Sequence, residues 1–242
     1  MKKVSTLRRA VTVAGLMLGF SISVDTALAQ ALGNSQVVQP DSNEFGNTYG
    51  EWSARWWQWL LSIPAANNPN FDTTGANCAL GQTGQVWFLA GTFGDHPYTR
   101  SCIIPSGKDL LVTPLAGVFG ELGPGGVSDC PGGPNECDPN HIRALAAANV
   151  DNPQLLEISV DNAQVKNLDQ FRVTSPVFSA FLPALALFDI PHGSHGPLVS
   201  DGYFVLLEQL SAGMHTIRLK GVASPAAGGF VIDVTYKLTV LK

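Results

Sequence analysis

The stretch YGEWSARWWQWLLSIP, residues 49–64, constrains the fold more than any other part of the chain. It holds four of the five tryptophans, and its apolar side chains recur every three or four residues, which is the spacing of a helix face. Thr48 and Glu51 form a capping-box signature at its start, and Pro64 predicts that the helix ends at Ile63. Because the apolar arc covers more than half of the circumference, the sequence predicts a Trp-rich amphipathic helix that is packed on a larger framework.

The first 29 residues have the pattern of a secretory signal peptide. Four lysines and arginines within the first nine residues precede an apolar run that ends at the small-x-small cleavage sequence of residues 27–29. We therefore expect a mature chain that begins at Gln30, is secreted or periplasmic, and has no transmembrane span after cleavage. Residues 30–44 are polar and without period, which predicts a linker, and residues 45–242 are predicted to form a single domain.

The mature chain is acidic. Cleavage after residue 29 leaves 10 lysines and arginines against 18 aspartates and glutamates, which is a net charge of −8. Binding to a phosphate backbone or to an anionic membrane surface depends on clustered lysine and arginine side chains. The charge therefore argues against nucleic acid as a partner and against binding to such a membrane surface.

Four cysteines in an exported chain predict two disulfides. Of the three possible pairings we favour the one that is local in sequence, Cys78 with Cys102 and Cys130 with Cys137. The chain has no CxxC pair and no histidine at zinc-finger spacing from a cysteine, so a structural zinc site is disfavoured.

After residue 64 the pattern changes to short apolar runs bounded by glycine, proline, asparagine and aspartate, which indicates strands. The predicted strands are residues 85–93, 99–104, 109–115, 156–160, 171–174, 177–182, 203–208, 215–219 and 230–240. Asp138 and Pro139 indicate the start of a short second helix that ends near Asn149. The predicted fold is mainly β: an antiparallel β-sandwich, with a jelly roll as one candidate topology, carrying the Trp-rich helix and the short helix.

Several motifs carry a resemblance to other proteins. YGEWSARWWQWLLSIP, GQVWFLAGTFG, CIIPSGK and DGYFVLLEQLSAGMHTI together resemble a set of small exported bacterial proteins of uncharacterised function. The resemblance covers most of the mature chain and implies no activity, so the functional hypotheses depend on the residues.

Trp57 is the candidate ligand-binding residue of the helix. Trp52, Trp56 and Trp59 share the main apolar stripe, which favours core packing, whereas Trp57 lies beside it. An indole face can stack on the apolar face of a sugar ring, so the leading hypothesis is an exported noncatalytic binding or structural protein with a carbohydrate ligand, for example a polysaccharide. Core packing of Trp57 is the competing interpretation. A cell-surface assembly subunit, with Trp57 and Leu61 in the subunit contact, is an alternative.

A second candidate site lies on the Gly/Pro-rich stretch of residues 188–203. Asp189, His192, His195 and Asp201 offer imidazole and carboxylate groups that could ligate a divalent metal, the one cofactor that the sequence suggests. This pattern predicts, as a further alternative, a secreted metal-assisted hydrolase or lyase that uses the loop of residues 189–201. The competing interpretation is a solvated loop with two incidental histidines, because His-x-x-His in a loop is a weak pattern.

Overall fold

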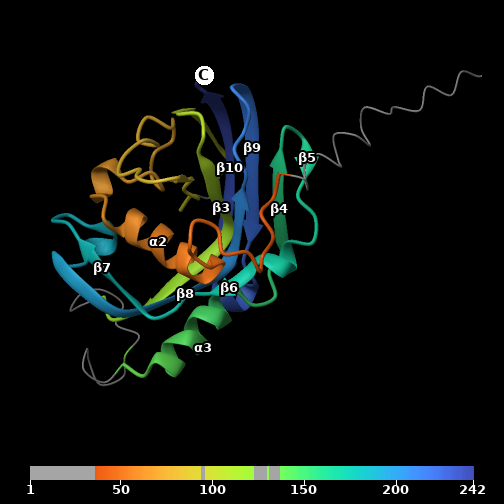
Figure 1. Cartoon of the computed structure of the whole chain (residues 1–242). Helices are drawn as coiled ribbons and strands as arrows, with labels where there is room; N and C mark the ends of the chain where they lie inside the picture. Colours follow the sequence, from red (N-terminus) through yellow and green to blue (C-terminus); the bar gives the residue numbers. More distant parts are fainter. Residues whose placement is uncertain (1–35, 94–95, 123–129, 131–136) are drawn as a thin grey trace, which may run out of the picture.

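The computed structural model describes residues 36–93, 96–122, 130 and 137–242 (Figure 1). The predicted signal peptide lies outside these residues and stays a prediction. Within the described ranges no helix is both long and apolar enough to cross a membrane. The part of the predicted linker that is described belongs to the domain, because Val37 and Val38 are buried and the Val38 amide donates to the Leu206 carbonyl.

The described chain is mainly β and forms two five-stranded sheets. The first sheet has the order β1-β3-β8-β6, with β7 also paired to β8, and contains β1 Val86–Phe88, β3 Asp109–Gly120, β6 Arg172–Thr174, β7 Phe178–Leu182 and β8 Gly193–Leu207. The second sheet has the order β2-β10-β9-β4-β5 and contains β2 Tyr98–Ile104, β4 Leu155–Val160, β5 Ala163–Gln164, β9 Gly213–Val222 and β10 Val231–Val240.

Two strand pairs are parallel, β1 with β3 and β2 with β10. The prediction that all strands are antiparallel is therefore wrong for these pairs. The chain leaves β1, forms β2 in the other sheet and returns to the first sheet as β3, so β1 and β3 run in the same direction. A hairpin cannot join parallel neighbours, and this crossover through the other sheet supplies the connection that they need.

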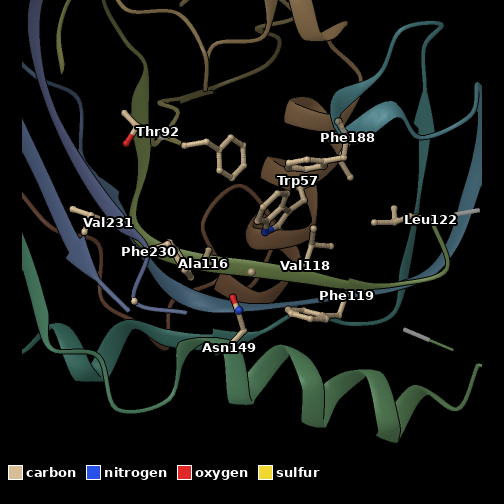
Figure 2. Close-up of a pocket in the computed structure, with 14 residues that line it drawn as sticks. Trp57, Thr92, Ala116, Val118, Phe119, Leu122, Asn149, Phe188, Phe230 and Val231 are labelled. Atoms are coloured by element: carbon tan, nitrogen blue, oxygen red, sulfur yellow. The ribbon is translucent and has the colours of Figure 1, made fainter. Parts of the chain in front are cut away.

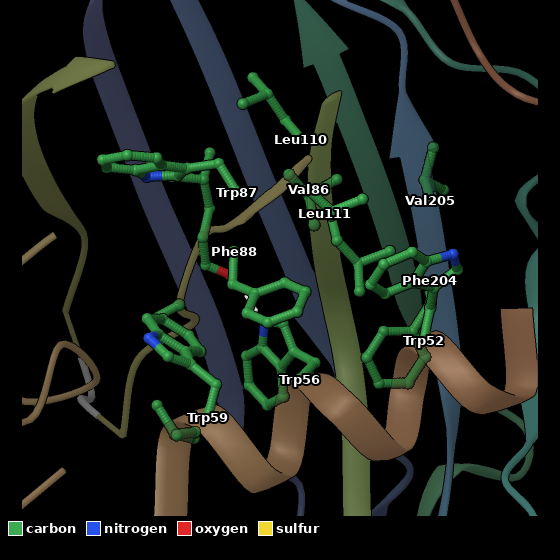
Figure 3. Packing of buried hydrophobic residues seen from close by; sticks show 14 of the residues in the cluster. Trp52, Trp56, Trp59, Val86, Trp87, Phe88, Leu110, Leu111, Phe204 and Val205 are labelled. Atoms are coloured by element: carbon green, nitrogen blue, oxygen red, sulfur yellow. Dashed lines mark hydrogen bonds between the residues drawn. The ribbon is translucent and has the colours of Figure 1, made fainter. Parts of the chain in front are cut away.

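The Trp-rich segment forms helix α2, Tyr49–Leu61, with the predicted capping box. The Glu51 amide donates to the Thr48 hydroxyl at 3.3 Å, and the Thr48 amide donates to the Glu51 carboxylate at 2.7 Å. The helix packs on β7, β8, β6 and β3, and its tryptophans enter the core beside β1 and β8 (Figures 1 and 3). A second helix of the described chain, α3 Pro139–Val150, has Asp138 as its N-cap, as predicted, and covers the opposite face of β3 and β8 (Figures 1 and 2).

In the described ranges four short 3₁₀ helices connect these elements. They are η1 Ala65–Asn67, η3 Leu168–Phe171, η4 Leu187–Asp189 and η5 Pro225–Ala227. The segment around η4 is unusual, since Leu185, Phe188 and Asp189 all have positive φ angles of 55–60°. Side chains with a Cβ are disfavoured in this region of conformational space, so the surrounding contacts must hold the segment in place.

Both predicted disulfides are confirmed. Cys78 is bonded to Cys102 with a Cα–Cα distance of 6.1 Å, and Cys130 is bonded to Cys137 with a Cα–Cα distance of 4.9 Å. The Cys78–Cys102 bond links the segment that precedes β1 to a residue of β2. It therefore joins the chain before and after its first passage from one sheet to the other.

The Gly/Pro-rich stretch of residues 188–203 is mostly strand and not loop. β8 begins at Gly193, pairs first with β7 and then, from Leu198 onward, with β3. Its length follows from β3, which continues five residues past its predicted end at Leu115 and supplies the partner for this part of β8. Glycine and proline weaken a strand locally, but a partner on each side compensates for that weakness.

Candidate functional site

A cavity of about 710 Å³ lies between α2, β3 and the start of β10 (Figure 2). This volume lies in the range of about 300–1,000 Å³ that is usual for small-molecule sites. Among the residues that the structure describes, the wall is aromatic and aliphatic except for Thr92 and Asn149, and none of these lining residues carries a charge. The wall consists of Trp57, Leu61, Thr92, Phe93, Ala116, Gly117, Val118, Phe119, Leu122, Asn149, Phe188, Gly229, Phe230 and Val231.

The cavity follows the open edge of β3. Four consecutive residues of this strand, 116–119, line it, although successive side chains of a strand point to opposite faces. Contact with all four is possible only along the edge. β1 pairs with β3 only as far as Leu111, so beyond that residue β8 is the one strand partner of β3 in the described chain. Pro114, which has no amide hydrogen, fits such an edge position.

The start of β10 forms the facing wall. Residues 229–231 line the cavity, whereas β2 pairs with β10 only from Val234 onward. The cavity therefore lies just beyond the C-terminal end of β1 and the N-terminal end of β2, between one strand edge of each sheet. Asn149 of α3 reaches this space beside Gly117, because a Cβ atom at Gly117 would lie 2.5 Å from the Asn149 Oδ1 atom.

Trp57 differs from the other three tryptophans of α2 in its hydrogen bonding. Trp52, Trp56 and Trp59 each donate their indole N–H to a backbone carbonyl, at 3.1, 3.0 and 2.8 Å respectively. The Trp57 Nε1 atom is buried and has no hydrogen-bond partner in the described chain. The Thr92 hydroxyl, also on the cavity wall, is buried and unpartnered in the same way. The structure thus places the predicted ligand-binding residue on the cavity, together with Leu61.

Aromatic side chains form the rim of the cavity. The rings of Phe71, Phe93 and Phe188 make a chain with centroid distances of 5.5 and 5.4 Å, and all three are about half exposed. Phe188 belongs to the positive-φ segment, and the neighbouring Leu185 is 83 % exposed. Large apolar side chains held at the surface by a disfavoured backbone are expected beside a binding site more often than elsewhere.

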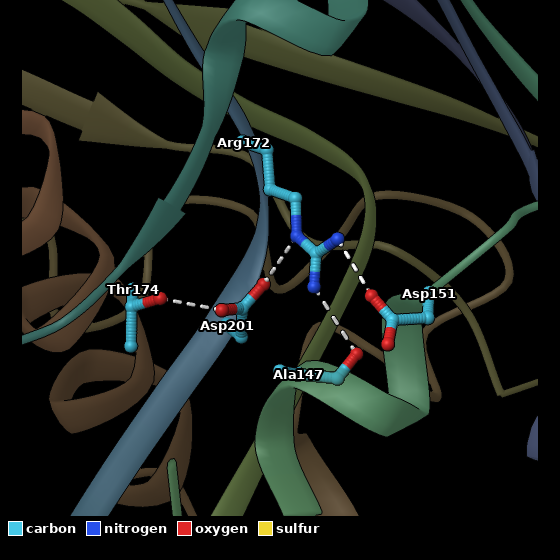
Figure 4. Close-up of polar contacts among 5 residues, drawn as sticks. All are labelled: Ala147, Asp151, Arg172, Thr174 and Asp201. Atoms are coloured by element: carbon cyan, nitrogen blue, oxygen red, sulfur yellow. Dashed lines mark hydrogen bonds and ion pairs between the residues drawn. The ribbon is translucent and has the colours of Figure 1, made fainter. Parts of the chain in front are cut away.

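The structure does not bring together the four side chains of the predicted metal site. Asp201 is buried, accepts from Arg172 Nε at 2.9 Å and from the Thr174 hydroxyl at 2.5 Å, and is thereby part of a structural ion-pair cluster (Figure 4). His195 makes a 2.7 Å hydrogen bond with the Pro191 carbonyl. His192 contacts the ring of Phe181 edge-on, and Asp189 lies in η4.

One group of three candidate metal ligands with atoms within 4.8 Å of one another occurs in the described ranges, and it contains none of those four residues. It consists of Glu121, Cys130 and Cys137. The two sulfur atoms form a disulfide and so are not available as thiolate ligands. In this arrangement the Asp201 carboxylate pairs with Arg172, and the structure does not bring it together with Asp189, His192 and His195. A metal at residues 189–201 therefore stays a prediction.

A second, smaller cavity of about 330 Å³ lies at the start of β3 and is acidic, with Glu44, Asp109 and Glu208 on its wall. The pKa of Asp109 is raised to about 6, chiefly by burial and to a lesser extent by the negative charges of Glu44 and Glu208. The folded protein therefore binds this proton more tightly than the unfolded chain does. The contribution of Asp109 to stability is most favourable below the unfolded pKa near 4 and becomes unfavourable as the pH rises through about 6.

Replacement of Asp109 by asparagine is expected to stabilise the protein above pH 6. At pH 7.5 the free energy of unfolding should rise by about 1–3 kcal/mol, and the gain should shrink toward zero at pH 4. Urea unfolding at the two pH values measures both quantities, with Asp41→Asn at an exposed position as the matched control. A variant that is equally destabilised at both pH values would contradict the assignment.

The cavity wall outside α2 was not predicted from the sequence. The segments around Gly117 and Phe230 become a wall only because β1 and β2 end where they do, and no local pattern indicates these ends. Comparison with models of known protein families, with curated protein sequences and with solved structures gives no match. The functional conclusion therefore rests on the geometry of the cavity.

Proposed function

We propose that the protein is an exported noncatalytic binding protein and that the cavity beside Trp57 holds its ligand, an uncharged and largely apolar small molecule. The observation that carries the proposal is the cavity wall, which is apolar over most of its area and, in the described part of the chain, contains no charged side chain. Burial of apolar surface in such a space is favourable by about 25 cal/mol per Å². Two disulfides and the signal-like N-terminus support a site of action outside the cytoplasm.

The framework that we propose for this site is a β-sandwich. Contacts of β3 with β9 and β10 support it, since they join the two sheets next to the cavity. The cavity then occupies the end of the sandwich at which one strand of each sheet loses its neighbour.

An apolar ligand fits the wall better than the carbohydrate that the sequence suggested. A sugar presents many hydroxyl groups, each of which needs a hydrogen-bond partner when it leaves water. Thr92 and Asn149 are the polar side chains of the wall, and Trp57 adds one donor. These few donors and acceptors suit a ligand with one or two polar atoms.

The test is a fluorescence titration of the mature protein with N-phenyl-1-naphthylamine, an uncharged apolar probe. Val118 projects from β3 toward Trp57 (Figure 2), so a Val118→Trp variant fills the space beside the indole. The variant should keep its melting temperature and bind the probe about tenfold more weakly or worse, because less apolar surface is buried. Val177→Trp adds the same ring at an exposed position outside the cavity and should bind the probe as the wild type does.

Absence of probe binding to the wild-type protein would overturn the proposal, as would equal loss of binding in both variants. Retention of the wild-type protein on a polysaccharide array, lost on truncation of Trp57, would replace the apolar ligand by the carbohydrate class.

The open edge of β3 favours a second candidate function, that of a subunit of a surface assembly. Backbone N–H and C=O groups at a strand edge can pair with a strand from another chain, and the apolar cavity could take its side chains. The same titration separates the two functions. Displacement of the probe by extended peptides, and not by small apolar molecules, would favour the assembly subunit.

A further inference from the structure

We propose that the ligand of the cavity carries an uncharged hydrogen-bond acceptor, such as the carbonyl oxygen of a ketone or an ester, and that the indole N–H of Trp57 is its donor. This inference rests on the proposed function and names the chemistry that the ligand must bring.

The four tryptophans of α2 differ in the hydrogen bonding of their indole N–H groups. Each of the other three indoles of this helix reaches a backbone carbonyl within 3.1 Å. Trp57, on the same helix and only 5 % exposed, has a buried N–H with no partner in the described chain. A buried donor without an acceptor costs free energy, and nearly all such groups in native proteins are paired. An acceptor that arrives with the ligand would remove this cost.

The Trp57 Nε1 atom lies on the side of the ring that faces β3. In Figure 2 the Trp57 ring points into the cavity, and its nitrogen lies on the side that faces β3, between Ala116 and Val118. This is the part of β3 whose edge has no partner strand in the described ranges. Because the Nε1 atom is buried, a ligand atom that enters between the ring and the strand reaches the N–H only when the indole turns slightly toward it.

A second unpartnered group on the same wall strengthens the case. The Thr92 hydroxyl is buried and unpartnered, and it can donate or accept. The buried N–H of Trp87 also lacks a partner in the described chain, but Trp87 does not line the cavity, so no ligand of the cavity could pair with it. Among the indoles of the described chain, Trp57 alone combines an unpartnered N–H with a place on the cavity wall.

The absence of charge on the described wall decides the class of acceptor. A carboxylate or phosphate in the cavity would be a buried charge without a counter-ion, and burial of such a charge is costly. A ketone, ester or amide oxygen accepts the same hydrogen bond at a much smaller desolvation cost. The geometry thus points to neutral acceptor-bearing molecules and away from free fatty acids.

The experiment compares valerophenone with pentylbenzene, two molecules of one skeleton in which a carbonyl replaces a methylene. Both are measured by displacement of N-phenyl-1-naphthylamine from the wild-type protein and from Trp57→Phe, which keeps an aromatic ring and removes the N–H. The loss of one hydrogen bond should lower the affinity of Trp57→Phe for valerophenone about tenfold, with a change of less than about twofold for pentylbenzene. Trp87→Phe is the matched control and should change neither affinity.

The outcomes separate the inference from the proposed function. If neither molecule displaces the probe from the wild-type protein, the cavity is not an apolar ligand site and both fail. If both molecules bind and Trp57→Phe weakens them equally or not at all, the ligand site stands and the role of the N–H is refuted. Tighter binding of 5-phenylpentanoate, the charged analogue, than of valerophenone would also overturn the inference.

Discussion

Truncation of Trp56 to alanine is expected to lower the free energy of unfolding by about 3–5 kcal/mol, as for other large truncations in cores. The side chain is 2 % exposed, and its N–H donates to the Leu89 carbonyl at 3.0 Å. Its ring meets those of Trp57, Trp59 and Phe204 at centroid distances of 5.0–6.1 Å. Figure 3 shows Trp56 between Trp59 and Phe204. The change therefore opens a cavity where α2 meets the sheet and leaves the Leu89 carbonyl without its donor.

Urea unfolding at constant pH measures this loss. Trp56→Phe should lose less than half as much, since the ring remains and mainly the hydrogen bond is removed. Arg55→Ala, at an exposed position of the same helix, should change stability by no more than about 0.5 kcal/mol. A melting temperature of Trp56→Ala equal to that of the wild type would show that α2 is not fixed to the sheet through this residue.

Replacement of Arg100 by methionine is expected to have an effect of similar size, a loss of about 3–5 kcal/mol. The guanidinium is 1 % exposed, and its hydrogen-bond partners are neutral oxygens and not carboxylates. These partners are the backbone carbonyls of Asn70, Asp72, Ala90 and Gly91, at 2.6–3.2 Å, and the Tyr236 hydroxyl at 2.7 Å. Arg100 thus joins two loops to β10, and methionine removes the Arg100 donor from all of these oxygens, of which the Ala90 carbonyl keeps the Tyr236 hydroxyl as a donor.

Replacement of Arg100 by lysine separates the effect of the planar guanidinium group from the effect of its positive charge. Arg100→Lys keeps the charge but has one nitrogen in place of a fork, so it cannot reach all five oxygens and should recover only part of the lost stability. The measurement is again urea unfolding. A methionine variant as stable as the wild type would show that burial of the guanidinium costs as much as its hydrogen bonds contribute.

Local patterns predicted the elements that depend on local physics. The three- and four-residue spacing and the capping box predicted α2, Asp138 and Pro139 predicted α3, and the alternation of residues 230–240 predicted β10. The disulfide pairing also followed from proximity in sequence. For the helices and β10 neighbours within a few residues determine the outcome, and the disulfide partners are separated by only 24 and 7 residues, so the sequence carries the information.

Features that depend on distant partners were missed. β8 was predicted as a loop up to residue 203 because its glycines and proline indicate a turn, whereas pairing with β3 and β7 outweighs them. The buried position of Arg100 follows from the meeting of two loops, which its strand pattern does not indicate. At the site, the place of Trp57 beside the helix stripe singled it out, but Thr92 and Phe230 have no local signature, since the ends of β1 and β2 create the cavity.

The central claim, that the cavity beside Trp57 is a ligand site, is tested most directly by a crystal structure of the mature protein soaked with 1-bromodecane. The bromine is located by its anomalous scattering. The account predicts an anomalous peak enclosed by Trp57, Val118 and Phe230, with no comparable peak elsewhere. A cavity filled by the protein's own side chains, or bromine peaks found only at other sites, would contradict it.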